Sequence, residues 1–174
     1  APRDGDGEAA YKHEGIDVFR YPVSASPSRD ESAGLEAPAT LDRFRRWLDD
    51  QAPDLYHQHG WTRGCGIYHL EAARTLGMAT VTTLHVPAAV CLRDTMLLHG
   101  ESVCDGRIDV ARCTRCWGRS RGIPAGVSAL LGQLPAGARL LSEALPGGAR
   151  LQTAAMTPTL VEAHHRRFDR LFAA

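Results

Sequence analysis

The chain has 174 residues and carries 20 lysines and arginines against 20 aspartates and glutamates, so its formal net charge is zero. A balanced charge gives no electrostatic signal for nucleic acid, and we expect no nucleic-acid partner, while peripheral membrane association stays open. No run of 18 apolar residues is present, and the start, APRDGDGEAA, lacks the features of a signal peptide. We therefore expect a cytoplasmic protein. Lys12 is the only lysine, a usage typical of GC-rich bacterial genomes.

The first predicted strand covers residues 15 to 23, GIDVFRYPV, where apolar and polar residues alternate up to a proline. A loop rich in Ser, Pro and Ala follows over residues 24 to 39. Thr40 then caps a predicted helix over residues 41 to 50. The apolar residues of this helix fall on one face, namely Leu41, Phe44, Trp47 and Leu48.

A βαβ unit is predicted next. Residues 54 to 59 form a strand, residues 65 to 77 a helix that ends at Gly77, and residues 78 to 86 a second strand. Strand, helix and strand within about 33 residues favour two parallel strands joined by a right-handed crossover. The sequence therefore indicates an α/β fold.

From residue 87 to about residue 122 the apolar periodicity disappears, which is unusual for a compact domain unless something else organises the loop. Two short helices are expected after it, over residues 124 to 134 and 138 to 145. The last helix is expected to begin with Thr157 as its cap and Pro158 at its first position.

Histidines lie at the ends of the two predicted parallel strands. Residues two apart in a strand point the same way, so His57 and His59 share a face. His85 is the last side chain of the second predicted strand, and ligands of open α/β sheets bind beyond the carboxyl ends of strands. If the strands are neighbours, we expect His59 and His85 to flank one crevice.

Each of these histidines could have a structural or a functional role. A hydrogen-bonded structural role is favoured for His57, with ligand contact as the alternative, and both roles stay open for His59. A functional role is favoured for His85, while His69 is expected at the surface. Gly60 would let a backbone N–H approach a ligand closely.

The stretch PDLYHQHGWTRGCGIYHLEAARTLGMATVTTLHVPAAVCLRD, residues 53 to 94, resembles the N-terminal domain of retaining family-4 glycosyltransferases of the GT-B type. That family shows a strand of the pattern Pro-Asp, two hydrophobic residues and His-x-His, then a Gly-rich turn. A helix ending near Gly and a strand ending in Thr-x-His follow. The matching positions here run from Pro53 to Gly60 and include Gly77, Thr83 and His85.

The resemblance implies a single Rossmann-like domain over residues 1–174, with a mostly parallel sheet, flanking helices and a Cys-rich insertion over residues 87–122. It implies that this domain receives the sugar acceptor and faces a C-terminal domain of the same protein that binds a nucleotide sugar. His85 would be the catalytic residue near the transferred sugar. The residues implied to bind substrate are His59, Gly60, Trp61 and Thr62.

Two departures from the family pattern affect this interpretation. No glycine-rich loop precedes the strand over residues 15 to 23, and the acidic donor-binding motif of the second domain is missing. We therefore expect the chain to be part of a longer protein and to be inactive alone.

Four of the five cysteines lie within 26 residues, with the spacing C-x12-C-x8-C-x2-C over Cys91, Cys104, Cys113 and Cys116. In a reducing compartment this spacing favours a structural Zn²⁺ site with four thiolates, which would order the aperiodic loop. The alternatives are an iron–sulfur cluster, a pair of disulfides and free thiols. Cys65, outside this group, is expected to be a small buried residue.

Three functions compete. The favoured one is the acceptor-side half of a glycosyltransferase that moves a sugar from a nucleotide sugar to a glycan or small molecule. The alternative is a zinc-stabilised α/β module that binds a protein and has no catalytic activity. A metal-dependent hydrolase that uses His57, His59 and His85 is less favoured, because no carboxylate-rich motif accompanies them.

Overall fold

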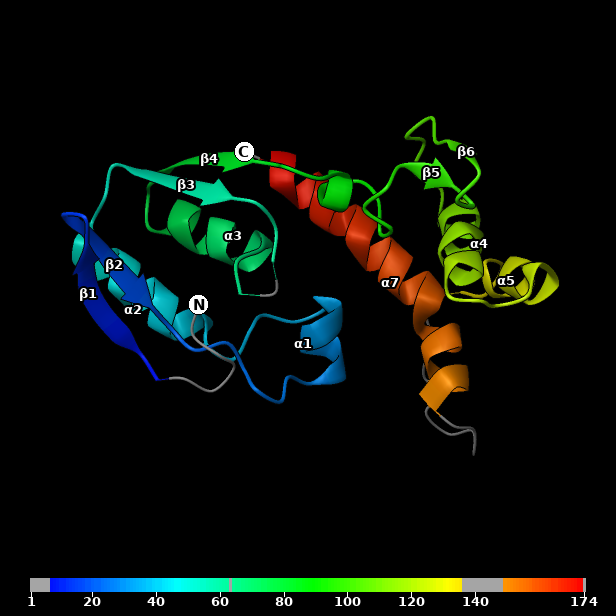
Figure 1. Cartoon of the computed structure of the whole chain (residues 1–174), viewed down its shortest axis with the longest axis horizontal. Helices are drawn as coiled ribbons and strands as arrows, with labels where there is room; N and C mark the ends of the chain where they lie inside the picture. Colours follow the sequence, from blue (N-terminus) through cyan, green and yellow to red (C-terminus); the bar gives the residue numbers. More distant parts are fainter. Residues whose placement is uncertain (1–6, 63, 136–148, 174) are drawn as a thin grey trace. The chain divides into compact units, whose positions relative to one another are not determined.

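The computed structural model describes residues 7–62, 64–135 and 149–173. The chain divides into two compact units, Ala1–Thr83 and Leu84–Ala174. The first unit contains β1 (Ala9–His13), β2 (Ile16–Arg20), α1 (Arg29–Ala33), α2 (Leu41–Gln51), β3 (Leu55–His59), α3 (Ile67–Thr75) and β4 (Ala79–Thr83) (Figure 1). The second contains η1 (Pro87–Ala89), β5 (Leu97–Leu98), β6 (Ser102–Val103), α4 (Val110–Ser120), α5 (Ala125–Leu131) and α7 (Ala149–Phe172).

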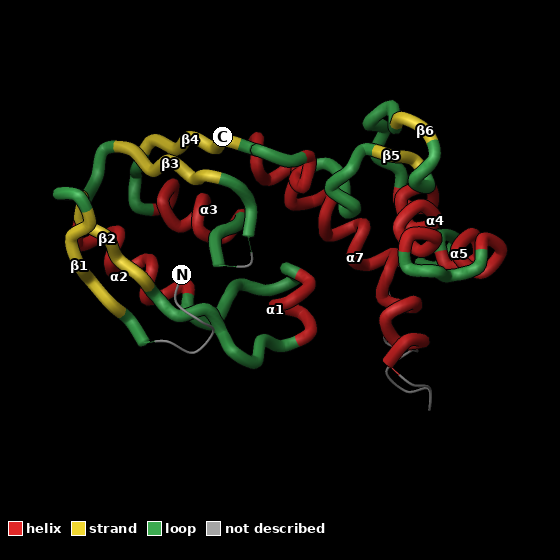
Figure 2. Tube along the Cα trace, in the orientation of Figure 1, coloured by secondary structure: helices red, strands yellow, loops and turns green. Residues whose placement is uncertain are grey.

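The strands among the described residues form three two-stranded sheets, drawn yellow in Figure 2. The β3–β4 pair is parallel, whereas β1–β2 and β5–β6 are antiparallel hairpins. The fold is therefore α/β, as predicted. In place of a mostly parallel sheet, however, the described residues hold one parallel pair and two hairpins.

The N-terminal hairpin depends on a tight turn between β1 and β2. Glu14 and Gly15 have φ angles of 50° and 82°, and a left-handed conformation at both central residues suits the right-handed twist of paired strands. β2 lies within the strand predicted over residues 15 to 23. The sequence does not predict β1, because all five of its residues are exposed and show no apolar alternation.

The predicted βαβ unit is confirmed. β3 and β4 pair in parallel from Leu55 opposite Ala79 to His59 opposite Thr83, and α3 connects them. Gly77 follows the helix with a φ of 82°, which allows the sharp return into β4. β4 ends at Thr83, so the prediction that this strand extends to residue 86 was wrong.

The core of the first unit lies between α2 and α3. Phe44 and Leu48 from α2 are buried against Ala72 and Ala73 from α3. Partly buried hydrophobic residues surround this cluster, namely Tyr21, Leu41, Trp47, Tyr56, Leu76 and Met78. The helix predicted from residue 41 thus buries the face that its sequence indicated.

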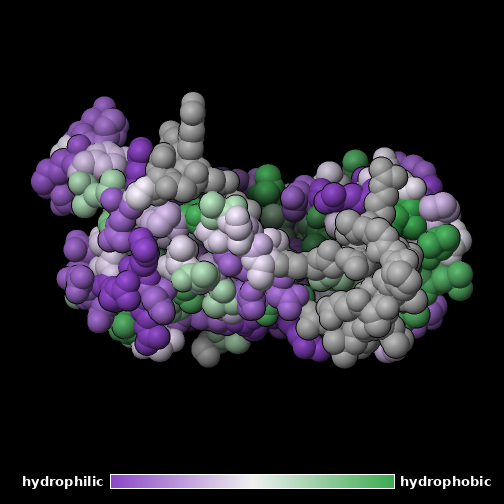
Figure 3. Space-filling view, turned by 90° about the horizontal axis from the view of Figure 1, so that it is seen from below, coloured by the Kyte–Doolittle hydropathy of each residue, from purple (hydrophilic) through white to green (hydrophobic). Residues whose placement is uncertain are grey.

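The second unit is built on α4, which packs against both α5 and α7. Asp109 caps α4 by accepting a hydrogen bond from the Arg112 backbone N–H at 2.7 Å. Apolar side chains on the outer surface of α5 stay exposed, among them Val127 and Leu130, and this part of the molecule is green in Figure 3.

The second unit differs from the sequence predictions in its loop and in its last helix. Residues 87–122 are not aperiodic, because they contain η1, β5, β6 and α4. The last helix spans Ala149–Phe172, so the prediction that it begins at Thr157 was wrong. Packing against α4 and α5 outweighs the backbone hydrogen bond that Pro158 removes. The helix expected over residues 138–145 lies outside the described residues.

Candidate functional site

The carboxyl end of β3 carries two neighbouring imidazoles. Side chains alternate along this strand, so Gln58 is buried toward α3 while His57 and His59 are exposed on the opposite face. The centroids of the two imidazole rings are 4.2 Å apart. His57 Nε2 also lies 2.8 Å from Oγ1 of Thr83 on β4, which is the kind of contact expected of a structural imidazole.

The turn that follows β3 holds the other predicted substrate-binding residues. Gly60 has a φ of 77°, and its N–H donates a hydrogen bond to the Thr83 carbonyl at 2.8 Å. The N–H of Gly60 itself is therefore engaged with β4. Thr62 and Cys65 exchange two backbone hydrogen bonds, of 2.9 and 3.2 Å, which close the turn. Trp61, half-buried, lies between Gly60 and this closure.

His85 occupies a different position from the one predicted. β4 ends two residues earlier, so His85 is an exposed residue beyond the strand and belongs to the second unit. The structure brings His57, His59 and the Gly60 turn together within the first unit. We refer to these described residues as the strand-end site.

A half-buried polar layer lies next to this turn, and sequence reasoning missed most of it. The Tyr21 hydroxyl donates to the Gly64 carbonyl, and the Tyr56 hydroxyl lies 3.1 Å from the Cys65 thiol and 3.2 Å from Gln58 Oε1. Burial is the main cause that raises the pKa of both tyrosines and of the Cys65 thiol. The layer is therefore uncharged at neutral pH, and its hydrogen bonds fix the turn from inside the unit.

His69 belongs to the same layer. The expectation that it lies at the surface was wrong, since only 1% of the residue is exposed. Its Nδ1 accepts the Gly66 N–H at 3.1 Å, and its ring meets the Phe44 ring edge-on at 4.9 Å. Burial lowers the pKa of His69 to about 4. A polar side chain three positions after the helix cap often accepts the N–H of the cap residue. The spacing of Gly66 and His69 could therefore have predicted this contact.

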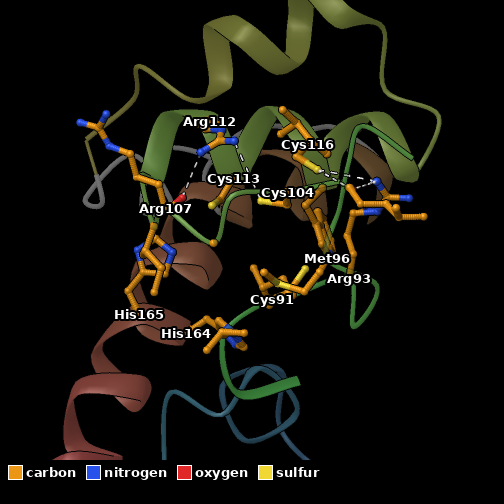
Figure 4. Close-up of a pocket in the computed structure, with 17 residues that line it drawn as sticks. Cys91, Arg93, Met96, Cys104, Arg107, Arg112, Cys113, Cys116, His164 and His165 are labelled. Carbon is orange, nitrogen blue, oxygen red and sulfur yellow. Dashed lines mark hydrogen bonds between the residues drawn. The ribbon is translucent and has the colours of Figure 1, made fainter. Parts of the chain in front are cut away.

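The second unit contains a cavity lined with sulfur (Figure 4). The four cysteines predicted to bind metal all contribute to its walls, namely Cys91, Cys104, Cys113 and Cys116. All of them are free thiols. Burial raises the pKa of the Cys113 thiol, and the neighbouring Cys104 and Cys116 raise it further.

The cavity is small, and its thiols are too far apart to coordinate one metal ion as they stand. Its volume is about 40 Å³. This is room for roughly three water molecules and far too little for a nucleotide sugar. In the part of the chain that the structure describes, no group of three or more His, Cys, Asp or Glu side chains is arranged to hold a metal ion.

These features define a class of protein: an α/β domain with a polar site at the carboxyl end of a parallel strand pair. The family model described as Glycosyl transferase 4-like domain matches residues 1–174, the whole length of the chain. The chain therefore belongs to the family of glycosyl transferase 4-like domains.

Two further observations accompany this assignment. No curated protein and no solved structure matched the chain in the same comparisons. Among the described residues, no helix combines the length and the apolar character needed to cross a membrane.

Proposed function

We propose that this chain is the acceptor-side half of a retaining glycosyltransferase that moves a sugar from a nucleotide sugar to a glycan or small-molecule acceptor. Membership of the glycosyl transferase 4-like family supports the reaction class. The observation that carries the acceptor-side assignment is the pair of imidazoles beside the Gly60 turn. It lies beyond the carboxyl ends of two parallel strands, where ligands of α/β sheets bind.

The chemistry asks this half of the enzyme to position groups and to stabilise charge. Retaining transfer on one face of the sugar, with the leaving phosphate assisting, needs no protein nucleophile, so orientation and hydrogen bonding carry the catalysis. In this proposal His85 donates a hydrogen bond to the transferred sugar and is the catalytic residue. It does not act as a general base.

The acceptor is held by the strand-end site. His59 is exposed at the end of β3 and presents ring nitrogens for hydroxyl groups. Trp61 offers an aromatic face for a sugar ring, and Thr62, exposed in the same turn, adds a hydroxyl. The N–H of Gly60 already donates to the Thr83 carbonyl, so it is not available to the acceptor. In this proposal Gly60 contributes because it has no side chain, which leaves space for the acceptor beside the turn.

The donor comes from a second domain of the same protein in this proposal. A cavity of about 40 Å³ in the second unit leaves no room for a nucleotide sugar. The exposed face of the β3–β4 pair fits a larger assembly, since Leu55 and Val81 on it are 50% and 45% exposed. Parallel sheets are normally covered on both faces, so we expect further parts of the complete protein to pack there.

A protein-binding module without catalytic activity is the second candidate, and the same exposed face favours it. Leu55 and Val81 form an apolar surface that a protein partner could cover as well as a second domain. The two candidates differ in one respect that can be measured. A transferase turns over a nucleotide sugar, and a binding module does not.

The test uses the protein encoded by the complete reading frame. Purified protein is incubated with a panel of nucleotide sugars, and release of nucleoside diphosphate is measured with and without a mixture of candidate acceptors. The proposal predicts slow hydrolysis of one donor, and faster release when the right acceptor is present. Release from no member of the panel, by protein that is folded and monodisperse, would reject the transferase and leave the binding module.

A further inference from the structure

The sulfur atoms of the cavity in the second unit come from two elements, the β5–β6 hairpin with its flanking residues and α4. Cys91 precedes the β5–β6 hairpin and Cys104 follows it directly, while Cys113 and Cys116 lie in the first turns of α4. Positions three apart on a helix project from the same face, so both α4 thiols reach the cavity (Figure 4). A hairpin flanked by two cysteines thus meets a helix that carries two more.

Nitrogen donors converge on these sulfur atoms. Cys116 Sγ lies 3.2 Å from the His99 backbone N–H donor and 3.7 Å from Arg93 Nη1. Arg112 Nη2 lies 4.0 Å from Cys104 Sγ, and Nη1 of the same residue is fixed by Asp105 at 2.6 Å. A protonated thiol is a weak acceptor, whereas a thiolate accepts strongly. The same two sulfur atoms also lie near acceptors that suit their protonated form, Cys116 Sγ 3.6 Å from the Leu97 carbonyl and Cys104 Sγ 3.9 Å from Asp105 Oδ1. If a metal ion displaces the thiol protons, the nitrogen donors are placed to contact the resulting thiolates.

A buried imidazole supplies a second, independent observation. His164 on α7 lines the same cavity and is 7% exposed. The Arg167 guanidinium, which can only donate, lies 3.5 Å from Nδ1, so Nδ1 is the acceptor and Nε2 carries the proton. Among the described residues, Nε2 has no hydrogen-bond partner although it is buried. An unpaired buried N–H is costly, and a charged sulfur in this cavity would satisfy it.

We propose that this cavity binds one Zn²⁺ ion through the thiolates of Cys91, Cys104, Cys113 and Cys116. The ion displaces the four thiol protons and draws the sulfur atoms together from their separated positions. Sulfur ligands select thiophilic metals, and a space of about 40 Å³ suits a single ion better than a cluster of several irons and sulfides. Arg93 and Arg112 lie beside the thiolates and offset part of the negative charge that four thiolates and one Zn²⁺ ion leave.

The site has a structural role in this proposal. Four sulfur ligands leave no open position for a substrate or water. The ion fastens the hairpin to α4, and the N–H of His164 attaches α7 to the same site. Some residues do not bind the metal but donate hydrogen bonds to its ligands. Their substitution typically lowers metal affinity by about 10- to 100-fold. We expect changes of this size for His164→Phe and Arg93→Gln.

The first experiment uses the full chain, purified under reducing conditions. It measures bound zinc and the number of thiols that react with a thiol reagent before and after a chelator removes the metal. The proposal predicts about one zinc per chain, with at most one reactive thiol in the loaded protein, that of Cys65, and four more reactive thiols after chelation. Chains that bind no added Zn²⁺, that carry iron with sulfide, or that contain disulfides would overturn it.

Matched variants locate the ion. Cys113→Ser removes a thiol of the cavity, and Cys65→Ser removes the one cysteine that lies in the first unit. Zinc affinity is expected to fall at least 100-fold in Cys113→Ser and to stay unchanged in Cys65→Ser. Equal affinity in both variants would place the ion elsewhere. Should Cys113→Ser fail to fold, the thiol protection measured on the parent chain still decides the proposal.

Discussion

His69 makes the first unit sensitive to acid. Its ring is buried between α3 and Phe44, and its Nδ1 accepts the Gly66 N–H only while that nitrogen is unprotonated. Protonation therefore removes the acceptor at the start of α3 and places a charge in the core. Because burial lowers the pKa of His69 in the folded chain, the unfolded chain binds the proton more tightly, and the free energy of unfolding falls as the pH falls.

The size of the effect follows from the pKa difference. A drop from 6.5 to about 4 corresponds to roughly 3 kcal/mol of stability that is present above pH 6.5 and lost as the pH approaches 4. Between roughly pH 7 and pH 5, a single histidine with these values loses about 2 kcal/mol. Burial also lowers the pKa of His164 in the second unit to about 4, so the contribution of His69 must be isolated by a variant.

His69→Gln is the informative substitution. A glutamine at this position can still accept the cap N–H but cannot take up a proton. Urea unfolding is followed at pH 7 and pH 5 in a Trp117→Phe background, which leaves Trp47 and Trp61 as reporters of the first unit. We expect the loss of stability between the two pH values to be about 2 kcal/mol smaller in the variant than in the parent.

The control for this experiment is His13→Gln, which replaces a histidine exposed on β1. This variant should keep the pH dependence of the parent. If His69→Gln also keeps it, the imidazole is not held neutral by burial, and the account of the layer next to the Gly60 turn is refuted.

Four further predictions concern packing and catalysis. A Cβ on Gly132 would lie 2.8 Å from the Ala111 carbonyl oxygen, so Gly132→Ala should lower the free energy of unfolding of the second unit by about 1–3 kcal/mol. Gly126→Ala on α5 meets open space, and the same urea titration should show a gain of up to about 1 kcal/mol from helix propensity. Phe44→Ala should cost the first unit about 3–5 kcal/mol in a urea titration, and a cost below 1 kcal/mol would contradict the assigned core. In the complete protein, His85→Ala should slow sugar transfer roughly 10- to 100-fold, and unchanged initial rates would remove His85 from the site.

The parallel unit could be predicted because several local signals agree there. The alternation of Leu55 to His59, the apolar stripe of α3 and the glycine after it all point to the same fold. The shared face of His57 and His59 follows directly from the strand period. The face on which a strand residue lies depends only on its position in the strand, so it can be predicted from the sequence.

Other features depend on tertiary contacts that no local pattern contains. α4 has few apolar residues among its arginines and cysteines, and its burial comes from contact with α5 and α7. His69 is polar by type but lies in the core because Phe44 packs on its ring. The end of β4 at Thr83 moves His85 off the strand, although the sequence continues with residues suited to a strand.

The acceptor-side assignment is tested most directly by the Michaelis constants of the complete protein for its two substrates. Trp61→Ala and His59→Ala are compared with the parent at saturating donor and then at saturating acceptor. The account predicts a KM for the acceptor raised about tenfold or more, with the KM for the nucleotide sugar unchanged. A raised KM for the nucleotide sugar, with the acceptor constant unaltered, would show that this turn belongs to the donor and would contradict the account.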